Sequence, residues 1–134
     1  MLDKDLTQRD PRASLESFDA FRELVERFPH SKYVADARLR MQYLVNSLAA
    51  HEIHVARYYY RRGAYVAAVN RAQSVITRYP NAPSHEEALF LLVASYDKLK
   101  LDTLRDDAER VLRQNFPSSK YFSKGTTEWW KRWD

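Results

Sequence analysis

Apolar residues recur at helical spacing along most of the chain, and proline residues interrupt the pattern. In the clearest stretch, residues 55–80, the spacing predicts one helix that ends at Gly63 and a second that ends at Pro80. Glycine reaches positive φ without strain, and proline cannot continue a helix. The second helix carries an apolar stripe with three- and four-residue spacing, made of Tyr65, Ala68, Val69, Ala72, Val75 and Ile76. The stretch therefore predicts a tightly packed helical hairpin.

An aromatic residue followed by proline ends three such stripes. These pairs are Phe28-Pro29, Tyr79-Pro80 and Phe116-Pro117. Three recurrences in 134 residues indicate an internal repeat, which is typical of a solenoid of helix pairs. The prolines are 51 and then 37 residues apart. The second spacing is close to the period of about 34 residues of a tetratricopeptide repeat.

The first, longer spacing indicates one extra helix. No glycine or proline occurs between His30 and Arg62. The interval predicts one helix of about 30 residues, roughly 45 Å long at a rise of 1.5 Å per residue. A break near Ala49-Ala50 is the alternative. The expected inward positions are Val34, Ala37, Met41, Leu44, Leu48, His51, Val55 and Tyr58.

Three further helices complete the predicted fold. Asp10-Pro11 is expected to open the first helix, Ser84 to cap another with Glu86 and Glu87 in its first turn, and residues 102–115 to form the last. We therefore predict an all-α, tetratricopeptide-like helical-hairpin solenoid with one long helix spanning two repeats. It occupies residues 1–117, and residues 118–134 form a C-terminal tail.

Composition excludes most catalytic chemistry. The chain has no cysteine, so disulfides, thiol catalysis and cysteine-ligated zinc are absent, and two glycines cannot form a phosphate-binding loop. Adjacent carboxylates (Asp106-Asp107 and Glu86-Glu87) point in different directions on a helix, and we expect them to be solvated. We predict no enzymatic activity and no cofactor. The N-terminus has no apolar signal region, and no run of about 18 apolar residues could span a membrane.

Two histidines lie on neighbouring turns of the predicted long helix. His51 and His54 flank Glu52, but the sequence offers no third ligand nearby. We interpret His51 as a core histidine rather than a metal ligand. Glu52 is expected to pair with an arginine or a tyrosine hydroxyl.

Arginine is concentrated in one part of the chain. Between Ile53 and Tyr79 there are five arginines and no acidic residue. Nucleic-acid binding, a solvated face and a protein interface each fit this pattern, and the net charge of +4 is low for the first. We favour an interface, because Tyr and Arg are typical hot-spot residues. Arg62, Tyr65 and Arg71 are expected to cluster around the Gly63 turn.

The tail ends in a short basic aromatic segment. Trp129, Trp130 and Trp133 surround Lys131 and Arg132. Such a segment could contact lipid headgroups or a partner's groove, or it could fold back over the apolar end of the last repeat, as solenoids require. We favour the last of these.

Several segments together resemble a known family. They are Arg9-Asp-Pro11, Phe28-Pro-His-Ser-Lys-Tyr33, Leu48-Ala-Ala-His-Glu52, Val55-Ala-Arg-Tyr-Tyr59 and above all Arg62-Gly-Ala-Tyr-Val-Ala-Ala-Val-Asn-Arg71. From about Asp3 to Pro117 the chain is similar to the C-terminal half of the BamD family. These are tetratricopeptide lipoproteins of the outer-membrane β-barrel assembly machinery in Gram-negative bacteria.

The resemblance implies a non-enzymatic scaffold at the periplasmic face of the outer membrane. It implies docking to BamA through the periplasmic POTRA domain nearest the barrel, and possible contact with other lipoproteins of the complex. The family's lipidated cysteine and first repeats are absent here, so we expect a shortened form. A generic tetratricopeptide peptide-binding module is the alternative. The family's basic contact matches Arg71, and the expected partner-binding residues are Arg71, Asn70, Arg62, Arg61 and Tyr65.

Overall fold

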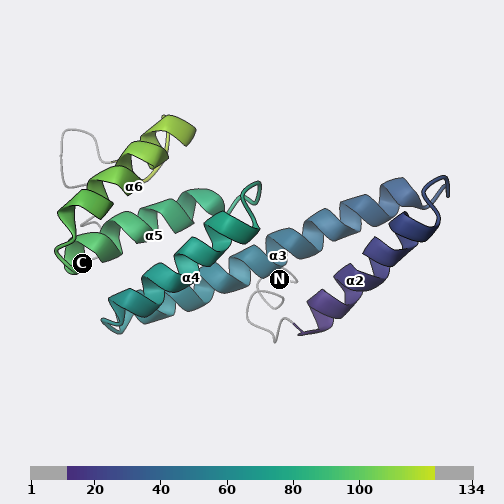
Figure 1. Ribbon diagram of the computed structural model, residues 1–134, viewed down its shortest axis with the longest axis horizontal. Helices are drawn as coiled ribbons and strands as arrows, with labels where there is room; N and C mark the ends of the chain where they lie inside the picture. Colours follow the sequence, from purple (N-terminus) through teal and green to yellow (C-terminus); the bar gives the residue numbers. More distant parts are fainter. Residues whose placement is uncertain (1–11, 123–134) are drawn as a thin grey trace. The chain divides into compact units, whose positions relative to one another are not determined.

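The computed structural model describes residues 12–122, which contain five helices and no strand (Figure 1). The chain divides into two compact units, residues 1–51 and 52–134, with the division inside the longest helix. The all-α prediction is confirmed. The helices are α2 (Arg12–Arg27), α3 (Val34–Arg61), α4 (Tyr65–Arg78), α5 (His85–Lys98) and α6 (Asp102–Asn115).

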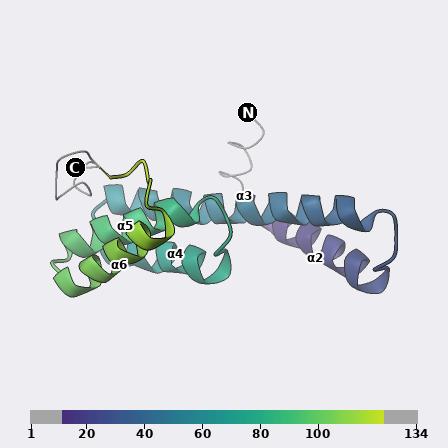
Figure 2. The same cartoon turned by 90° about the horizontal axis from the view of Figure 1, so that it is seen from above.

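The helix α3 is continuous over 28 residues, close to the predicted length (Figure 2). It passes through Ala49 and Ala50 without interruption, so the alternative of a break there is wrong. The predicted inward face is partly wrong in the second unit. Ile53, Ala56 and Tyr60 are buried there, whereas Tyr58 is 51% exposed. The buried seam runs through Ala49, Ile53, Ala56 and Tyr60, in steps of four, three and four residues, rather than through Val55 and Tyr58.

In the first unit, α2 and the beginning of α3 form a hairpin that buries little. Val34 and Ala37 of α3 are buried, but α2 has no buried residue. Its predicted apolar face is half-buried at Phe18 and Phe21 and exposed at Leu15. Asp10 and Pro11, the predicted start of α2, lie outside the described residues.

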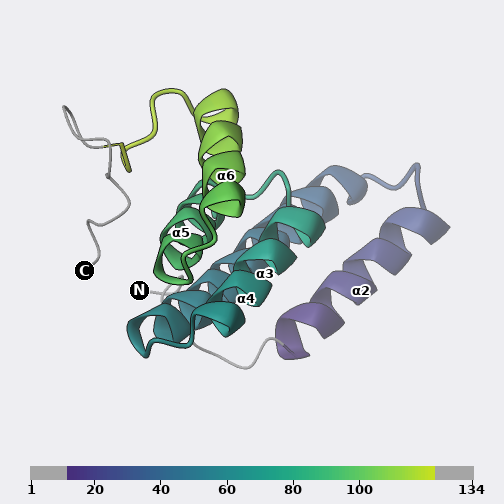
Figure 3. The same ribbon diagram turned by 60° about the vertical axis from the view of Figure 1, so that its left-hand side comes forward.

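In the second unit, α5 lies between α4 and α6 and packs against both (Figure 3). Nine consecutive residues of α5, from Ala88 to Tyr96, are buried. A helix that is apolar on every side belongs in the centre of a bundle. By contrast, Leu104 of α6 was predicted to point inward but is 46% exposed, because no further described helix covers α6 on that side.

Two helices of this unit end in the same left-handed turn. After α3, Gly63 has a φ of +79°, and the N–H of Ala64 donates to Tyr59 O at 2.9 Å. After α5, Lys100 has a φ of +60°, and the N–H of Leu101 donates to Tyr96 O at 2.9 Å. Both turns are Schellman motifs, in which glycine is the usual residue at the positive-φ position.

The expectation that adjacent carboxylates are solvated is wrong for Glu86 and Glu87. Arg57 donates to both carboxylate oxygens of Glu87 at 2.5 and 2.7 Å, and the Glu87 side chain is only 18% exposed. Glu86 accepts a hydrogen bond from the Ser119 hydroxyl at 2.6 Å. These contacts join α5 to α3 and to the segment that follows α6. Ser84 stands at the predicted cap position of α5, but its side chain makes no cap hydrogen bond.

The two ends of the chain, residues 1–11 and 123–134, are outside the described part, and this includes the tryptophan-rich segment. Within residues 12–122, none of the helices combines the length and the apolar character needed to cross a bilayer.

Candidate protein-docking site

The candidate site is built around an ion pair between α4 and α3. Arg71 donates from Nη1 to Oε2 and Oε1 of Glu52, at 3.1 and 3.3 Å. The expected pairing of Glu52 with an arginine is confirmed. The Arg71 side chain is 44% exposed and the Glu52 side chain 17%. Glu52 is therefore the buried member of the pair, which anchors Arg71, and Arg71 is the member that reaches the surface.

The other edge of the Arg71 guanidinium remains available. Within residues 12–122, every hydrogen bond recorded for Arg71 comes from Nη1. The Nε and Nη2 atoms form the edge of the planar fork that commonly binds a carboxylate through two parallel hydrogen bonds. A guanidinium held by Glu52 through one nitrogen is thus oriented to receive a second carboxylate from outside.

The packing between α3 and α4 holds this pair in place. Ala68, Ala72 and Val75 of α4 are fully buried. Tyr60 and Tyr65 meet edge to face, with ring centroids 5.5 Å apart. Tyr65 is half-buried, so it fixes the hairpin and offers only part of its ring to a partner.

Tyr79, at the end of α4, lies close to the pair. Burial raises the pKa of its hydroxyl, the Arg78 guanidinium lowers that pKa, and the Glu52 carboxylate raises it. The Glu52 charge therefore acts both on Arg71 and on the last residue before Pro80. This link has no signal in the sequence.

The predicted site residues do not form one cluster. Asn70 is exposed and adjacent to Arg71, as expected. Arg61, however, follows Glu52 by nine residues on α3, and at about 100° per residue this places the two side chains on opposite faces. Arg61 and Arg62 line a hollow of about 280 Å³ together with His54, Arg57 and Tyr58. Of the three residues expected to cluster around Gly63, Arg62 lines this hollow, whereas Tyr65 and Arg71 do not.

The hollow is basic and aromatic. The Arg62 guanidinium lies 5.0 Å from the centroid of the Tyr58 ring, a cation–π contact. Arg57, at its edge, is held by Glu87. The concentration of these arginines is visible in the sequence, but their separation from Arg71 is not, since only the register of α3 against its neighbours decides which flank each occupies.

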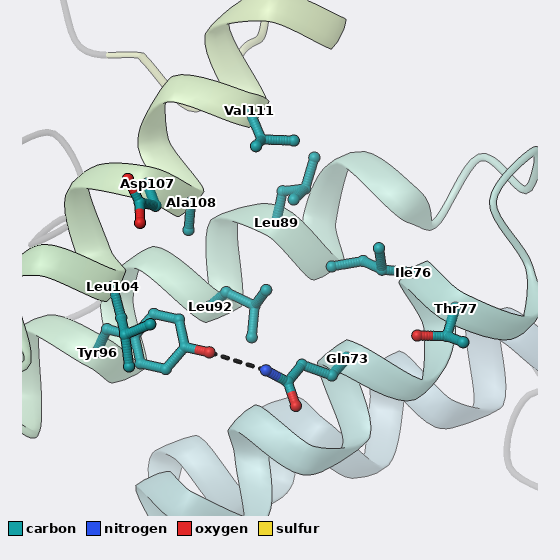
Figure 4. A pocket seen from close by; sticks show the side chains of 10 residues that line it. All are labelled: Gln73, Ile76, Thr77, Leu89, Leu92, Tyr96, Leu104, Asp107, Ala108 and Val111. Atoms are coloured by element: carbon teal, nitrogen blue, oxygen red, sulfur yellow. Dashed lines mark hydrogen bonds between the residues drawn. The ribbon is translucent and has the colours of Figure 1, made fainter.

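A third feature is a groove between α4, α5 and α6, shown in Figure 4. Its volume is about 380 Å³. Gln73 Nε2 donates to the Tyr96 hydroxyl at 2.9 Å along one edge. The remaining lining is mostly aliphatic and includes Ile76, Leu89, Leu92, Leu104, Ala108 and Val111. This is the groove that a peptide-binding module would use.

The histidines have different surroundings. His54 is exposed and lines the basic hollow, whereas His51 is half-buried. The described residues contain no group of three or more histidine, aspartate or glutamate side chains arranged to hold a metal ion.

Comparison with known proteins places the chain in a family context. Residues 2–112 match the sequence model of the YfiO family, which is described as outer membrane lipoprotein. A Neisseria meningitidis serogroup B protein named outer membrane protein assembly factor BamD is 47% identical over 134 residues, covering 97% of this chain and 50% of the relative. A protein of the same name from Neisseria gonorrhoeae is 46% identical, covering 97% of this chain and 50% of its own length. Another, from Haemophilus influenzae, is 35% identical, covering 83% of this chain and 42% of its own length. The chain thus spans about half the length of the curated relatives it matches.

Proposed function

This chain belongs to the YfiO family of outer membrane lipoproteins and is similar to proteins named outer membrane protein assembly factor BamD, and we propose that it is a non-enzymatic scaffold in outer-membrane protein assembly. In this proposal it docks BamA through a periplasmic POTRA domain and thereby supports the folding and insertion of outer-membrane proteins. Its place is the periplasmic face of the outer membrane.

The observation that carries the proposal is the half-exposed Arg71 guanidinium with one edge committed to Glu52. A partner carboxylate that meets the Nε and Nη2 edge forms a bidentate pair, and the interface then removes both groups from water. Truncating one member of a buried, hydrogen-bonded charge pair costs about 2–5 kcal/mol of binding free energy. Much of this cost comes from leaving the partner's charge buried and unpaired.

Asn70 and Tyr65 extend the same surface. Asn70 is exposed beside Arg71 and carries both a donor and an acceptor. Arg61 and Arg62 serve this interface only if the partner also reaches the opposite flank of α3. The proposal therefore ranks Arg71 first and predicts smaller effects for Arg61 and Arg62.

The direct test is binding of purified chain variants to the isolated POTRA region of BamA. Arg71→Ala is preferable to Arg71→Glu, because a glutamate would stand next to Glu52 and repel it within the fold. We expect Arg71→Ala to weaken binding at least about thirtyfold, which corresponds to the lower figure of about 2 kcal/mol. Unchanged affinity would refute the proposal.

Two further variants make the result specific. Arg78→Ala removes an exposed arginine from the same helix and should leave affinity close to that of the unmodified chain. Arg71→Lys keeps the charge but loses the planar fork, so it should recover only part of the affinity. Circular dichroism of each variant establishes that helicity is unchanged.

The second candidate is a generic tetratricopeptide module, which the aliphatic groove between α4, α5 and α6 favours. It predicts that substitutions in the groove, such as Leu92→Ala, weaken partner binding more than Arg71→Ala does. The same titration decides between the two candidates.

A further inference from the structure

The basic hollow beside the end of α3 has no part in docking through Arg71. The described residues that line it are His54, Arg57, Tyr58, Arg61 and Arg62. They follow one another in steps of three, one, three and one residues, so their side chains share one face at the end of the helix. The buried seam through Ile53, Ala56 and Tyr60 occupies a different face. The hollow has a volume of about 280 Å³, and α3 with the turn after it supplies all of this lining.

Positive charge predominates in the basic hollow. Three of its five described lining residues are arginines, and none of the five is acidic. Arg57 has a carboxylate partner in Glu87. The Arg62 guanidinium lies over the Tyr58 ring and has no carboxylate partner within residues 12–122. A cation–π contact does not satisfy the N–H donors of a guanidinium. Arg62 therefore presents both charge and hydrogen-bond donors to a ligand in the hollow.

Hydrogen bonds fix the framework of the hollow before a ligand binds. Arg57 is held from α5 by both carboxylate oxygens of Glu87, at 2.5 and 2.7 Å. The backbone N–H of Arg62 donates to Tyr58 O and Tyr59 O, at 3.2 and 3.1 Å. The negative end of a helix dipole amounts to about half a charge, which the full charge of one guanidinium exceeds. A site arranged in advance loses less entropy when it binds a ligand.

We propose that the basic hollow binds a phosphate group. A phosphate monoester carries a charge of about −1.5 to −2 at pH 7 and three strong acceptor oxygens. The planar guanidinium matches phosphate oxygens through parallel N–H hydrogen bonds. Arginines on successive turns of one helix face reach different oxygens of one phosphate, whereas a single carboxylate offers only two oxygens. His54 adds a ring N–H and Tyr58 a hydroxyl to these donors.

Two sources of phosphate share this chemistry, a lipid headgroup and a free phosphate compound. If the chain acts at the face of the outer membrane, as proposed above, headgroups are close to it. The phosphate site does not depend on that location, because it follows from the described side chains alone. The test therefore begins with free phosphate and then separates the two sources with vesicles.

An NMR titration of the complete 134-residue chain with inorganic phosphate tests the site. At an ionic strength kept constant with chloride, we expect saturable shifts of the amide resonances of residues 54–62. Arg62→Gln should weaken the affinity at least about tenfold, since it removes hydrogen bonds to a charged group. Arg62 is exposed, so the substitution leaves the buried core unchanged, and the same spectra show that the variant is folded. Shifts that do not saturate, or an unchanged affinity in Arg62→Gln, would overturn the proposal.

Arg78→Gln is the matched control. It lowers the net charge by the same one unit, but Arg78 is exposed on α4 and does not line the hollow. This variant should keep the phosphate affinity of the unmodified chain, and equal losses in both variants would contradict a specific site. Sodium acetate in place of phosphate is the second comparison. If acetate binds as tightly as phosphate, the hollow suits a carboxylate of an acidic peptide, and the phosphate assignment is wrong.

Cosedimentation with vesicles distinguishes the two sources. Phosphatidylcholine vesicles that contain phosphatidic acid should bind the unmodified chain and Arg78→Gln but bind Arg62→Gln much less, while pure phosphatidylcholine should bind none of them. This result makes a lipid headgroup the source. Saturable binding of inorganic phosphate without vesicle binding makes a free phosphate compound the source. Vesicle binding that is equal in all three proteins would contradict a role for the hollow in lipid binding.

The phosphate site and the docking site fail separately, because Arg71 does not line the hollow. If Arg62→Gln loses phosphate while Arg71→Ala still binds BamA normally, only the docking proposal fails. If Arg71→Ala loses BamA while phosphate shifts no resonance of residues 54–62, only the phosphate proposal fails.

Discussion

Arg71 of α4 and Glu52 of α3 form an ion pair in which Glu52 is mostly buried and Arg71 is nearly half-exposed. The two residues are 19 positions apart in sequence, and the α3–α4 hairpin brings them to 3.1 Å. The pair has two roles. It fixes one nitrogen of the guanidinium, and it presents the other edge to solvent in a defined orientation.

Loss of the anchor should weaken docking without removing the docking charge. Glu52→Gln leaves Arg71 in place but replaces its carboxylate partner with a neutral amide. We expect a several-fold loss of affinity for the POTRA region, smaller than the loss in Arg71→Ala. The free energy of unfolding should fall by only about 0.5–1 kcal/mol, since Arg71 is nearly half-exposed and a pair that solvent reaches contributes little. Calorimetric titration and urea unfolding measure the two effects, and equal affinity in Glu52→Gln would show that the orientation of Arg71 is unimportant.

Tyr79 should make stability depend on pH at the alkaline end. Burial raises its pKa in the folded chain above the unfolded value near 10. As the pH rises past the unfolded pKa, the unfolded state loses this proton first, and stability therefore declines. Tyr79→Phe removes this contribution. Urea unfolding between pH 8 and about pH 11 should show a shallower decline in the variant than in the unmodified chain, and parallel curves would contradict the assignment.

The pair between Arg57 and Glu87 should matter more for stability than the surface pairs. Arg57→Ala leaves a carboxylate that is only 18% exposed without its main partner. We expect a loss of about 2 kcal/mol in the free energy of unfolding, typical of hydrogen bonds to charged groups.

Removing the orphaned charge provides the check. Glu87→Gln added to Arg57→Ala should restore part of the lost stability, because a neutral amide is less costly to bury. As a control, Arg40→Ala breaks an exposed pair with Asp36 and should cost less than about 0.5 kcal/mol. If the double variant is less stable than Arg57→Ala alone, the stability lost in Arg57→Ala does not come from an unpaired Glu87 carboxylate.

Introducing a glycine at one left-handed turn and removing the glycine from the other should have opposite effects on stability. Lys100→Gly should stabilise the chain by about 1 kcal/mol, because a lysine at φ +60° carries a strain that glycine lacks. Gly63→Ala should destabilise it by a similar amount. The cause is backbone strain rather than crowding, since a Cβ at position 63 would meet no atom within 4 Å. Thermal unfolding of both variants measures the difference, and shifts of the same sign would contradict the turn assignment.

Helix identities could be predicted because each depends on local signals. Gly63 and Pro80 delimit α4, and the absence of glycine and proline between residues 30 and 62 indicates the long α3. The turn at Lys100 was missed, since its residue type gives no sign of positive φ. There the hydrogen bonds from the Leu101 N–H to Tyr96 O and from the Lys100 N–H to Asp97 O set the conformation.

The site was predicted less completely than the fold. Arg71 could be selected from the resemblance and from its place in a basic stretch. Its separation from Arg61 depends on the rotation of α3, which three- and four-residue spacing determines only to within about one position. The predicted seam through Val55 and Tyr58 was off by that amount, and the same error merged two basic surfaces into one. The burial of Glu87 was missed because its partner Arg57 lies 30 residues away.

A double-mutant cycle detects whether Arg71 meets a carboxylate of BamA. Each aspartate and glutamate of the POTRA region is changed to alanine in turn, and its affinity is measured against the unmodified chain and against Arg71→Ala. We expect one carboxylate whose coupling energy with Arg71 is at least about 1.5 kcal/mol, while its coupling with Arg78 is near zero. Strictly additive effects for every carboxylate would contradict it.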